Sequence, residues 1–273
     1  MMSLEPLLQL AGMISPGLPL PLSHRGYRRF VIAGAPRTGS TLLAERCESH
    51  PSMACFGEVL APERVEWLRR RGPETGWIED YRNRSIPRFL ERAIWHRYPR
   101  CIRAVGLKLL YHHFLSHREA LLPYLRAQPD LHVILLRRRN LLANCVSALV
   151  AHETGRYTIR DDGARPSLPR VTIAPERCEE WFRRYMLTDR LVTASFAGHP
   201  SLDLDYETLV ADPEGQNERL CAFLGVEAHA LRQQTVKMDP MPLSERVANF
   251  EVLRAHFAGT EWARFFEEST AQE

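Results

Sequence analysis

Residues 28–47, with the sequence RRFVIAGAPRTGSTLLAERC, combine an apolar run, a loop with glycine and a second apolar segment. The run over 28–34 is typical of a buried strand, and residues 40–49 are typical of a helix. Gly34 and Gly39 have the spacing of the phosphate-binding motif G-x-x-x-x-G-K-[ST], which requires this order of strand, loop and helix. Serine stands where that motif has lysine. The stretch therefore predicts an anion-binding loop of unusual chemistry.

The rest of the 273-residue chain alternates between strand and helix patterns. Apolar runs predict further strands at 101–111, 131–138 and 201–207. Helices are expected over 58–70, 86–98, 116–128, 140–153, 175–196 and 212–226, with weaker helical signals at 249–257 and 261–268. Strands that alternate with helices predict a P-loop-type α/β fold, with a parallel sheet flanked by helices on both faces.

This pattern predicts a single domain over residues 28–273, preceded by an N-terminal arm over 1–27. The polar stretch 154–174 is rich in glycine and proline, and we expect it to be a loop at the acceptor site. Residues 4–22 are apolar, but they contain four prolines and follow no basic residue. They fit neither a signal peptide nor a membrane helix, so we expect no integral membrane segment.

Composition sets broad limits on the class of protein. The net charge of +3 is too small to indicate a nucleic-acid partner. The six cysteines include no C-x-x-C pair, which favours a reducing, cytoplasmic compartment. All but two of the 36 basic residues are arginine, and the exceptions are Lys108 and Lys237. Genomic base composition is the simplest explanation of this bias, although arginine also suits bidentate recognition of phosphate or sulfate.

A second departure from nucleotide triphosphatases, besides the missing lysine, occurs at the end of the predicted strand over 131–138. In nucleotide triphosphatases an aspartate after an apolar strand holds magnesium. Here the strand at 131–138 ends in Arg137, Arg138 and Arg139, and cations repel magnesium and attract anions. Strand alternation places Arg137 and Arg139 on one face and Arg138 on the other. With Arg37 inside the loop, the site is predicted to bind anionic groups with no metal between them.

A donor of this kind is 3′-phosphoadenosine 5′-phosphosulfate (PAPS). Its sulfuryl group carries less charge than a γ-phosphoryl group, and its 3′-phosphate needs a second anion pocket. The segments PRTGSTLL (36–43) and RNLLANCVS (139–147) resemble the two donor motifs of bacterial sulfotransferases, most of all the rhizobial nodulation-factor and related carbohydrate sulfotransferases. Further similar segments bring the likeness to residues 30–267, and they are GEVL (57–60), VGLKL (105–109), DYETLVADPEG (205–215) and residues 242–267.

The resemblance implies a role for each matching residue. The 5′-phosphosulfate would be held by Arg37, Thr38, Gly39, Ser40 and Thr41. Arg139 and Ser147 would hold the 3′-phosphate, although helical rise alone separates them by about 12 Å, so the arginine must reach back. Glu58 would be the general base for an acceptor hydroxyl, and Lys108 would neutralise the leaving group. The implied acceptor is a carbohydrate, a glycolipid or another small metabolite.

Other interpretations stay open on the sequence alone. A metal-dependent P-loop kinase of a small molecule would need Asp203 or Asp205 as its magnesium ligand, and activity in excess EDTA would separate the two enzymes. A nucleotide sensor or scaffold would have kept the loop without the chemistry. Glu58 could instead be an acid at a helix N-terminus. Whether the chain forms a homodimer is also open.

Several polar and aromatic residues have more than one predicted role. His112 or His113 could line the acceptor pocket, although surface or packing roles fit both better. Tyr206 and Trp181 could stack on adenine or a sugar, or belong to the core. Two residues of the C-terminal segment are candidates to close over the donor, and they are Arg246 and Asn249.

Overall fold

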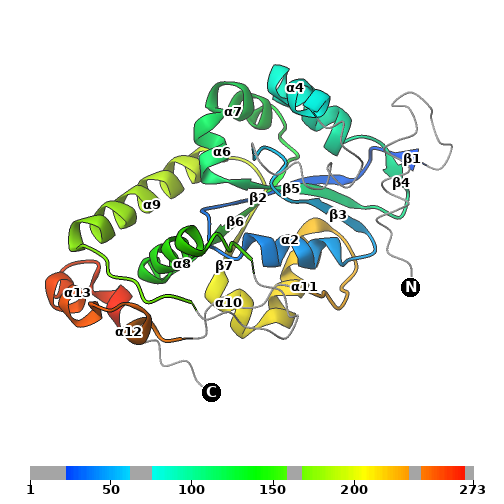
Figure 1. Ribbon diagram of the computed structural model, residues 1–273. Helices are drawn as coiled ribbons and strands as arrows, with labels where there is room; N and C mark the ends of the chain where they lie inside the picture. Colours follow the sequence, from blue (N-terminus) through cyan, green and yellow to red (C-terminus); the bar gives the residue numbers. More distant parts are fainter. Residues whose placement is uncertain (1–22, 62–75, 159–167, 234–240, 268–273) are drawn as a thin grey trace.

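The computed structural model describes residues 23–61, 76–158, 168–233 and 241–267 (Figure 1). At its centre is a five-stranded sheet in the order β3-β5-β2-β6-β7, in which all four pairings are parallel. The strands are β2 (Arg28–Gly34), β3 (Met53–Phe56), β5 (Ala104–Leu110), β6 (His132–Arg137) and β7 (Ser201–Asp205). This arrangement confirms the predicted α/β class with a parallel sheet.

Helices lie in the connections between the strands and in the chain that follows β7. They are α2 (Ser40–Glu48), α4 (Gly76–Arg84), α5 (Ile86–Phe89), the π-helix η1 (Leu90–Ile94), α6 (Tyr111–Ser116), α7 (Arg118–Arg126), α8 (Leu141–Thr154), α9 (Pro175–Ser195), α10 (Tyr206–Ala211), α11 (Pro213–Leu224), α12 (Leu243–Arg246), α13 (Phe250–Phe257) and the 3-10 helix η2 (Ala263–Phe266). The Asn140 side chain caps α8 by accepting from the Ala143 N–H at 2.9 Å. Gly225 ends α11 in the left-handed conformation.

Several segments differ from the sequence-based expectation. Helices α6 and α10 begin at Tyr111 and Tyr206, where strands were expected, α4 was not predicted, and the helix expected over 86–98 ends at Ile94. The four-residue strand β3 was not predicted, and it forms the edge of the sheet beside β5. The helix expected over 58–70 does not begin at its predicted start, because residues 58–61 lie in a turn. The rest of that predicted helix lies outside the described residues.

The sheet separates two apolar layers. Phe30 and Ile32 point from β2 into the layer that contains residues of α2, α10 and α11. The alternate residues Val31 and Ala33 point into the larger layer, which contains residues of α5 to α9 and α13. Figure 1 shows α2, α10 and α11 on one side of the strands and α6, α7 and α9 on the other. The central strands are buried on both faces, which explains their continuous apolar runs.

The structure describes only part of the predicted N-terminal arm and only part of the predicted acceptor loop. Residues 1–22 lie outside the described part, whereas β1 (Ser23–His24) pairs antiparallel with β4 (Tyr98–Pro99). Within the loop expected over 154–174, residues 159–167 also lie outside it. Val171 forms a bridge with Val247 after this gap. Among the described helices, none combines the length and apolar character needed to span a membrane.

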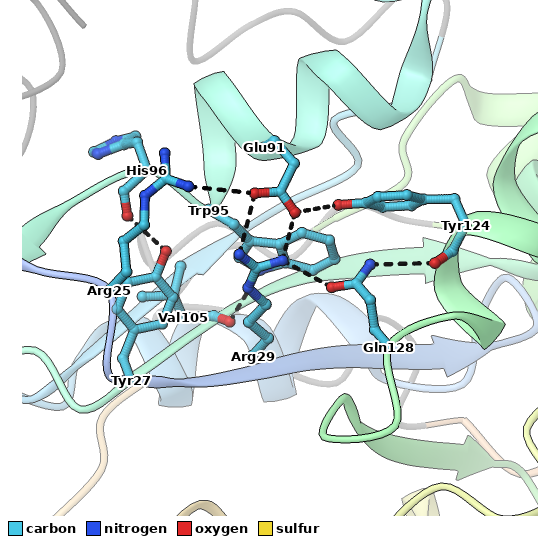
Figure 2. A network of polar contacts seen from close by, with 9 residues as sticks. All are labelled: Arg25, Tyr27, Arg29, Glu91, Trp95, His96, Val105, Tyr124 and Gln128. Carbon is cyan, nitrogen blue, oxygen red and sulfur yellow. Dashed lines mark hydrogen bonds and ion pairs between the residues drawn. The ribbon is translucent and has the colours of Figure 1, made fainter. Parts of the chain in front are cut away.

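A polar network joins β2 to η1 and α7 at the edge where β2 begins (Figure 2). The Arg29 guanidinium donates to both carboxylate oxygens of Glu91, at 2.5 and 3.1 Å, and to Gln128 at 2.8 Å. The Tyr124 hydroxyl donates to Glu91 at 2.6 Å. The guanidinium carbon of Arg29 also lies 5.2 Å from the centre of the Trp95 ring. This network ties the first strand of the sheet to two helices on one face.

Glu91→Gln is expected to lower the free energy of unfolding by about 1–2 kcal/mol, because it weakens a charge-assisted network whose members are only partly exposed. Burial raises the pKa of Glu91, but hydrogen bonds from Arg29 and Tyr124 outweigh it and hold the pKa below the ordinary 4.5. The stabilisation is therefore present above about pH 4.5 and is lost as the pH falls through the lower folded pKa.

Denaturant melts of the wild-type protein and of Glu91→Gln, from neutral pH to below pH 4.5, measure the effect. The free energies of unfolding of the two proteins should converge as the pH falls. The matched control is Glu179→Gln, which removes an exposed ion pair with Arg183 on α9 and should change stability little. Equal losses in the two variants would show that the network contributes no more than an exposed pair.

Candidate functional site

The loop between β2 and α2 depends on both glycines of the phosphate-binding motif. A Cβ on Gly34 would lie 2.6 Å from the backbone oxygen of Leu136. Gly39 has φ of 84°, and a Cβ there would lie 2.6 Å from the Tyr206 ring. Arg37 is also left-handed, with φ of 68°, which costs a non-glycine residue about 1–2 kcal/mol. The loop therefore keeps an arginine at a position where the backbone favours glycine.

The N-terminus of α2 is open toward this loop. Helix α2 begins at Ser40, and Gly39 provides no side-chain cap. The Thr38 side chain is fully buried and donates to the Ala35 carbonyl at 2.8 Å. Thr38 therefore closes the loop with its hydroxyl, which is already engaged by the backbone. Backbone N–H groups at a helix N-terminus suit negatively charged oxygen atoms.

Asn144 on α8 supports the loop from behind. Its Nδ2 donates to the Pro36 carbonyl at 2.8 Å, and its Oδ1 accepts from Trp181 Nε1 at 3.1 Å. Asn144 is fully buried. Sequence reasoning missed this residue, although a polar side chain among the apolar residues of α8 was a usable signal. Trp181 packs against the larger core layer, in agreement with the core alternative for this residue.

Ser147 and Arg139, which the resemblance assigns to one phosphate, have different partners. The Ser147 hydroxyl accepts from Arg37 Nε at 3.1 Å, and Arg37 Nη1 also donates to the Tyr157 carbonyl. The Arg139 side chain is 62% exposed, and its Nε lies 3.8 Å from Glu207 Oε2. The structure thus brings Ser147 to the loop arginine and leaves Arg139 at the surface next to a carboxylate.

Arg137 is the last residue of β6 and belongs to a structural ion-pair network. Its Nε donates to both oxygens of Asp189 on α9, at 2.9 and 3.0 Å, and Nη2 donates to Thr193 at 2.9 Å. Nη1 pairs with Asp203 of β7. Arg137 therefore faces α9 and does not approach the loop. Asp203, one of the two alternative magnesium ligands for a kinase, is ion-paired with this arginine.

Arg138 leaves the strand in the other direction and lies against the loop. Its guanidinium carbon is 4.9 Å from the centre of the Tyr206 ring, and Nη1 donates to the Arg37 carbonyl at 3.2 Å. Its Nε is buried and has no hydrogen-bond partner in the part of the chain that the structure describes. Burial lowers the pKa of Arg138. A buried N–H without a partner is costly, and an anionic oxygen bound here would satisfy it.

Glu58 and Lys108 meet at the carboxyl edge of the sheet. Lys108 is the charged residue of β5, and it is 4% exposed on the face covered by α2. Its Nζ lies 2.9 Å from Glu58 Oε1 and donates to Thr41 Oγ1 at 3.0 Å. Glu58 follows β3, and its side chain is 14% exposed. A carboxylate and a buried ammonium group thus lie together beside the first turn of α2.

Two histidines at the start of α6 complete this corner. His113 is 1% exposed, and its Nδ1 accepts from the Leu110 N–H at 3.1 Å. Its Nε2 lies 4.0 Å from Glu58 Oε2. Burial and the neighbouring His112 lower the pKa of His113 to about 3, so the ring is neutral at physiological pH. His112 is exposed at the surface.

Arg246 and Asn249 hold the segment that follows the gap at 159–167. Arg246 Nη1 donates to the Leu168 and Pro169 carbonyls, at 2.5 and 3.0 Å. The Asn249 side chain accepts from the Ile173 N–H at 3.1 Å and donates to its carbonyl at 2.8 Å. Both residues therefore order one end of the predicted acceptor loop.

The chain is similar to known proteins over most of its length. The model of the sulfotransferase family matches residues 29–230. Nodulation protein H of Rhizobium meliloti is 32% identical over 248 residues, which cover 88% of this chain and 95% of that protein. Nodulation protein H of Rhizobium tropici is 29% identical, over 87% and 92% of the two chains. A solved sulfotransferase from Alicyclobacillus acidocaldarius has 18% identity and a TM-score of 0.43, over 84% of this chain and 90% of that one.

Proposed function

Because the chain belongs to the sulfotransferase family and is a PAPS-dependent sulfotransferase, we propose that its acceptor is a hydroxyl of a carbohydrate, a glycolipid or another small metabolite. The observation that supports a hydroxyl acceptor is that Lys108 contacts both Glu58 and Thr41 beside the anion-binding loop. It combines a base for the incoming hydroxyl with a cation for the departing phosphate.

The donor would lie across the loop and the start of α8. The 5′-phosphosulfate would contact the N–H groups at the start of α2, with Arg37, Thr38, Gly39, Ser40 and Thr41 around it. Arg139 and Ser147 would hold the 3′-phosphate. The link from Ser147 to Arg37 supports a continuous anion site, because it connects the two donor motifs directly. The partnerless Nε of Arg138 supports an anionic ligand at this position.

Transfer would occur in one displacement at sulfur. The acceptor oxygen attacks the sulfuryl group, the new S–O bond forms, and the bond from sulfur to the bridging oxygen of the donor breaks. Glu58 takes the proton of the acceptor hydroxyl. Lys108 neutralises the charge that develops on the bridging oxygen, which leaves on 3′-phosphoadenosine 5′-phosphate (PAP). We propose that no metal ion takes part, since arginines and N–H groups supply the compensating charge.

The resemblance to nodulation-factor sulfotransferases supports a carbohydrate acceptor. The polar segment at 154–174 would shape its binding site, because Tyr157 reaches the loop arginine. A cytoplasmic location is supported by free thiols, five of which are buried. The kinase alternative has little support, since Asp203 is ion-paired with Arg137 and no lysine follows Gly39.

The donor proposal is tested by thermal melts with PAP, AMP and ADP. PAP should raise the melting temperature far more than either mononucleotide, because only PAP occupies a 3′-phosphate site and ligand affinity adds to stability. Arg139→Ala should remove most of this discrimination. Arg138→Ala should weaken PAP and AMP to a similar degree, since Arg138 supports the loop backbone that both 5′-phosphates would use.

Equal stabilisation of the wild-type protein by PAP and AMP would overturn the 3′ site. Discrimination that survives Arg139→Ala but disappears in Arg138→Ala would move the 3′ contact to Arg138.

A further inference from the structure

The proton on the His113 ring can be assigned from its one hydrogen bond. The Leu110 backbone N–H can only donate, so Nδ1 of His113 must present a lone pair to it at 3.1 Å. A neutral imidazole carries a single ring proton. That proton must therefore be on Nε2, the atom that lies 4.0 Å from Glu58 Oε2.

The surroundings keep this ring neutral and leave its donor unused. Within the described residues, Nε2 is buried and has no hydrogen-bond partner. The titratable groups that act on His113 are Glu58, Lys108, His112 and His117. Burial and His112 outweigh the attraction of the Glu58 carboxylate, so the pKa of His113 falls to about 3. The ring is thus a neutral donor that faces the carboxylate and not a second general base.

We propose that His113 is a positioning residue for Glu58, with its Nε2–H directed at Oε2 while Lys108 holds Oε1. This inference rests on the proposed role of Glu58 as the base. Lys108 is shared between Glu58 and Thr41, and the bridging oxygen of the donor would compete for the same ammonium group. A neutral donor on the other oxygen keeps the carboxylate oriented when the lysine turns toward the leaving group. The 4.0 Å distance is longer than a hydrogen bond, so the carboxylate must move toward the ring for the bond to form.

The same tautomer argues against a metal site at this corner. Ligand atoms of Glu58, His112 and His113 lie within 4.8 Å of one another, a grouping that could hold a divalent cation. A metal needs a lone pair on Nε2 of His113, which would move the proton to Nδ1, opposite the Leu110 N–H. The Lys108 ammonium, 2.9 Å from Glu58, would also repel the ion. The cluster therefore has proton-donor chemistry and not metal-ligand chemistry.

The first test reads the tautomer and does not depend on activity. In the full chain labelled with [15N]histidine, the signals lost in His113→Gln identify His113. We expect an unprotonated Nδ1 and a protonated Nε2, with no titration between about pH 5 and 8. A protonated Nδ1, or titration within that range, would overturn the proposal.

The second test reads the effect on Glu58. His113→Leu should lower kcat about tenfold, because the carboxylate loses one orienting donor. His113→Gln should restore most of the rate, since its amide can donate from a similar position. PAP-induced stabilisation should be the same in all three proteins, and thermal melts show whether each is folded. Equal rates in the leucine and glutamine variants would reduce His113 to a packing residue.

A calorimetric titration with Zn²⁺ alone distinguishes a metal site at this cluster from the proposed proton donor on His113. No stoichiometric binding is expected for the wild-type protein. One-to-one binding that His113→Gln abolishes would contradict the assigned tautomer. If Glu58→Gln leaves turnover normal while the spectrum shows the expected tautomer, the proposed base fails and the proton assignment stands.

Discussion

Replacing Glu58 with glutamine is expected to lower turnover about a hundredfold or more, the usual scale for loss of a general base. Glutamine keeps the size of the side chain and an oxygen that can accept from Lys108, which lies 2.9 Å from Oε1. It cannot take the proton of the acceptor hydroxyl. The local structure should therefore be retained while the chemical step slows.

The measurement is a single-turnover rate beside the calorimetric affinity for PAP. The affinity should be almost unchanged, because Glu58 lies beside the lysine and not in the anion-binding loop. A near-normal rate would remove Glu58 from the chemistry. A loss of affinity in proportion to the loss of rate would give it a structural role in donor binding.

Lys108→Met is expected to slow the chemical step about a hundredfold to a thousandfold, because the leaving group loses its cation in a water-poor site. Methionine suits the position sterically, since Lys108 is 4% exposed and its stem runs along the α2 face of β5. Removing the buried ammonium also leaves Glu58 without its ion-pair partner. Thermal melts are therefore needed to confirm that the variant is folded.

A second donor separates the two roles of this lysine. With a donor analogue whose leaving group is a weaker base, less charge needs neutralising, so the effect of Lys108→Met should shrink. If both donors slow equally, Lys108 orients the site and does not stabilise developing charge. The comparison with Glu58→Gln is informative, because a shared orienting role would make the two substitutions non-additive.

Patterns within short stretches of sequence predicted those elements of the fold that neighbouring residues determine. The strand, loop and helix at 28–47 were predicted because glycine spacing, a β-rich run and a helical pattern coincide in one segment. The helix expected over 212–226 ends at Leu224, because Gly225 adopts the left-handed conformation that glycine tolerates. The strand β3 was missed because MACF is only four residues long. Its pairing with β5 supplies the structure that its own sequence does not specify.

In the candidate site, too, local features could be predicted from the sequence, whereas contacts between distant segments could not. The loop residues could be named from their motif, and Glu58 and Lys108 from a resemblance, but nothing in their spacing predicted a contact of 2.9 Å. Arg137 and Arg138 have different partners, as the predicted alternation requires, but β6 ends at Arg137, so neither Arg138 nor Arg139 lies in the strand. The face predicted to be shared by Arg137 and Arg139 therefore has no strand to define it. The support from Asn144 and the donor on His113 depend on residues that meet only in the folded chain.

The order β3-β5-β2-β6-β7 also governs how this enzyme is made. Val31 of β2 pairs with Leu107 on one side and Val133 on the other, so both neighbours of the first long strand are synthesised much later. Closing such long loops costs entropy before the contacts repay it, and parallel sheets of this kind fold slowly. During synthesis the apolar strand β2 leaves the ribosome without partners, a state that exposes hydrophobic surface and invites aggregation. The loop, Glu58 and Lys108 of the proposed active site all lie in the first half of the chain, yet the sheet around β2 can close only after β6, which ends at Arg137, has been synthesised.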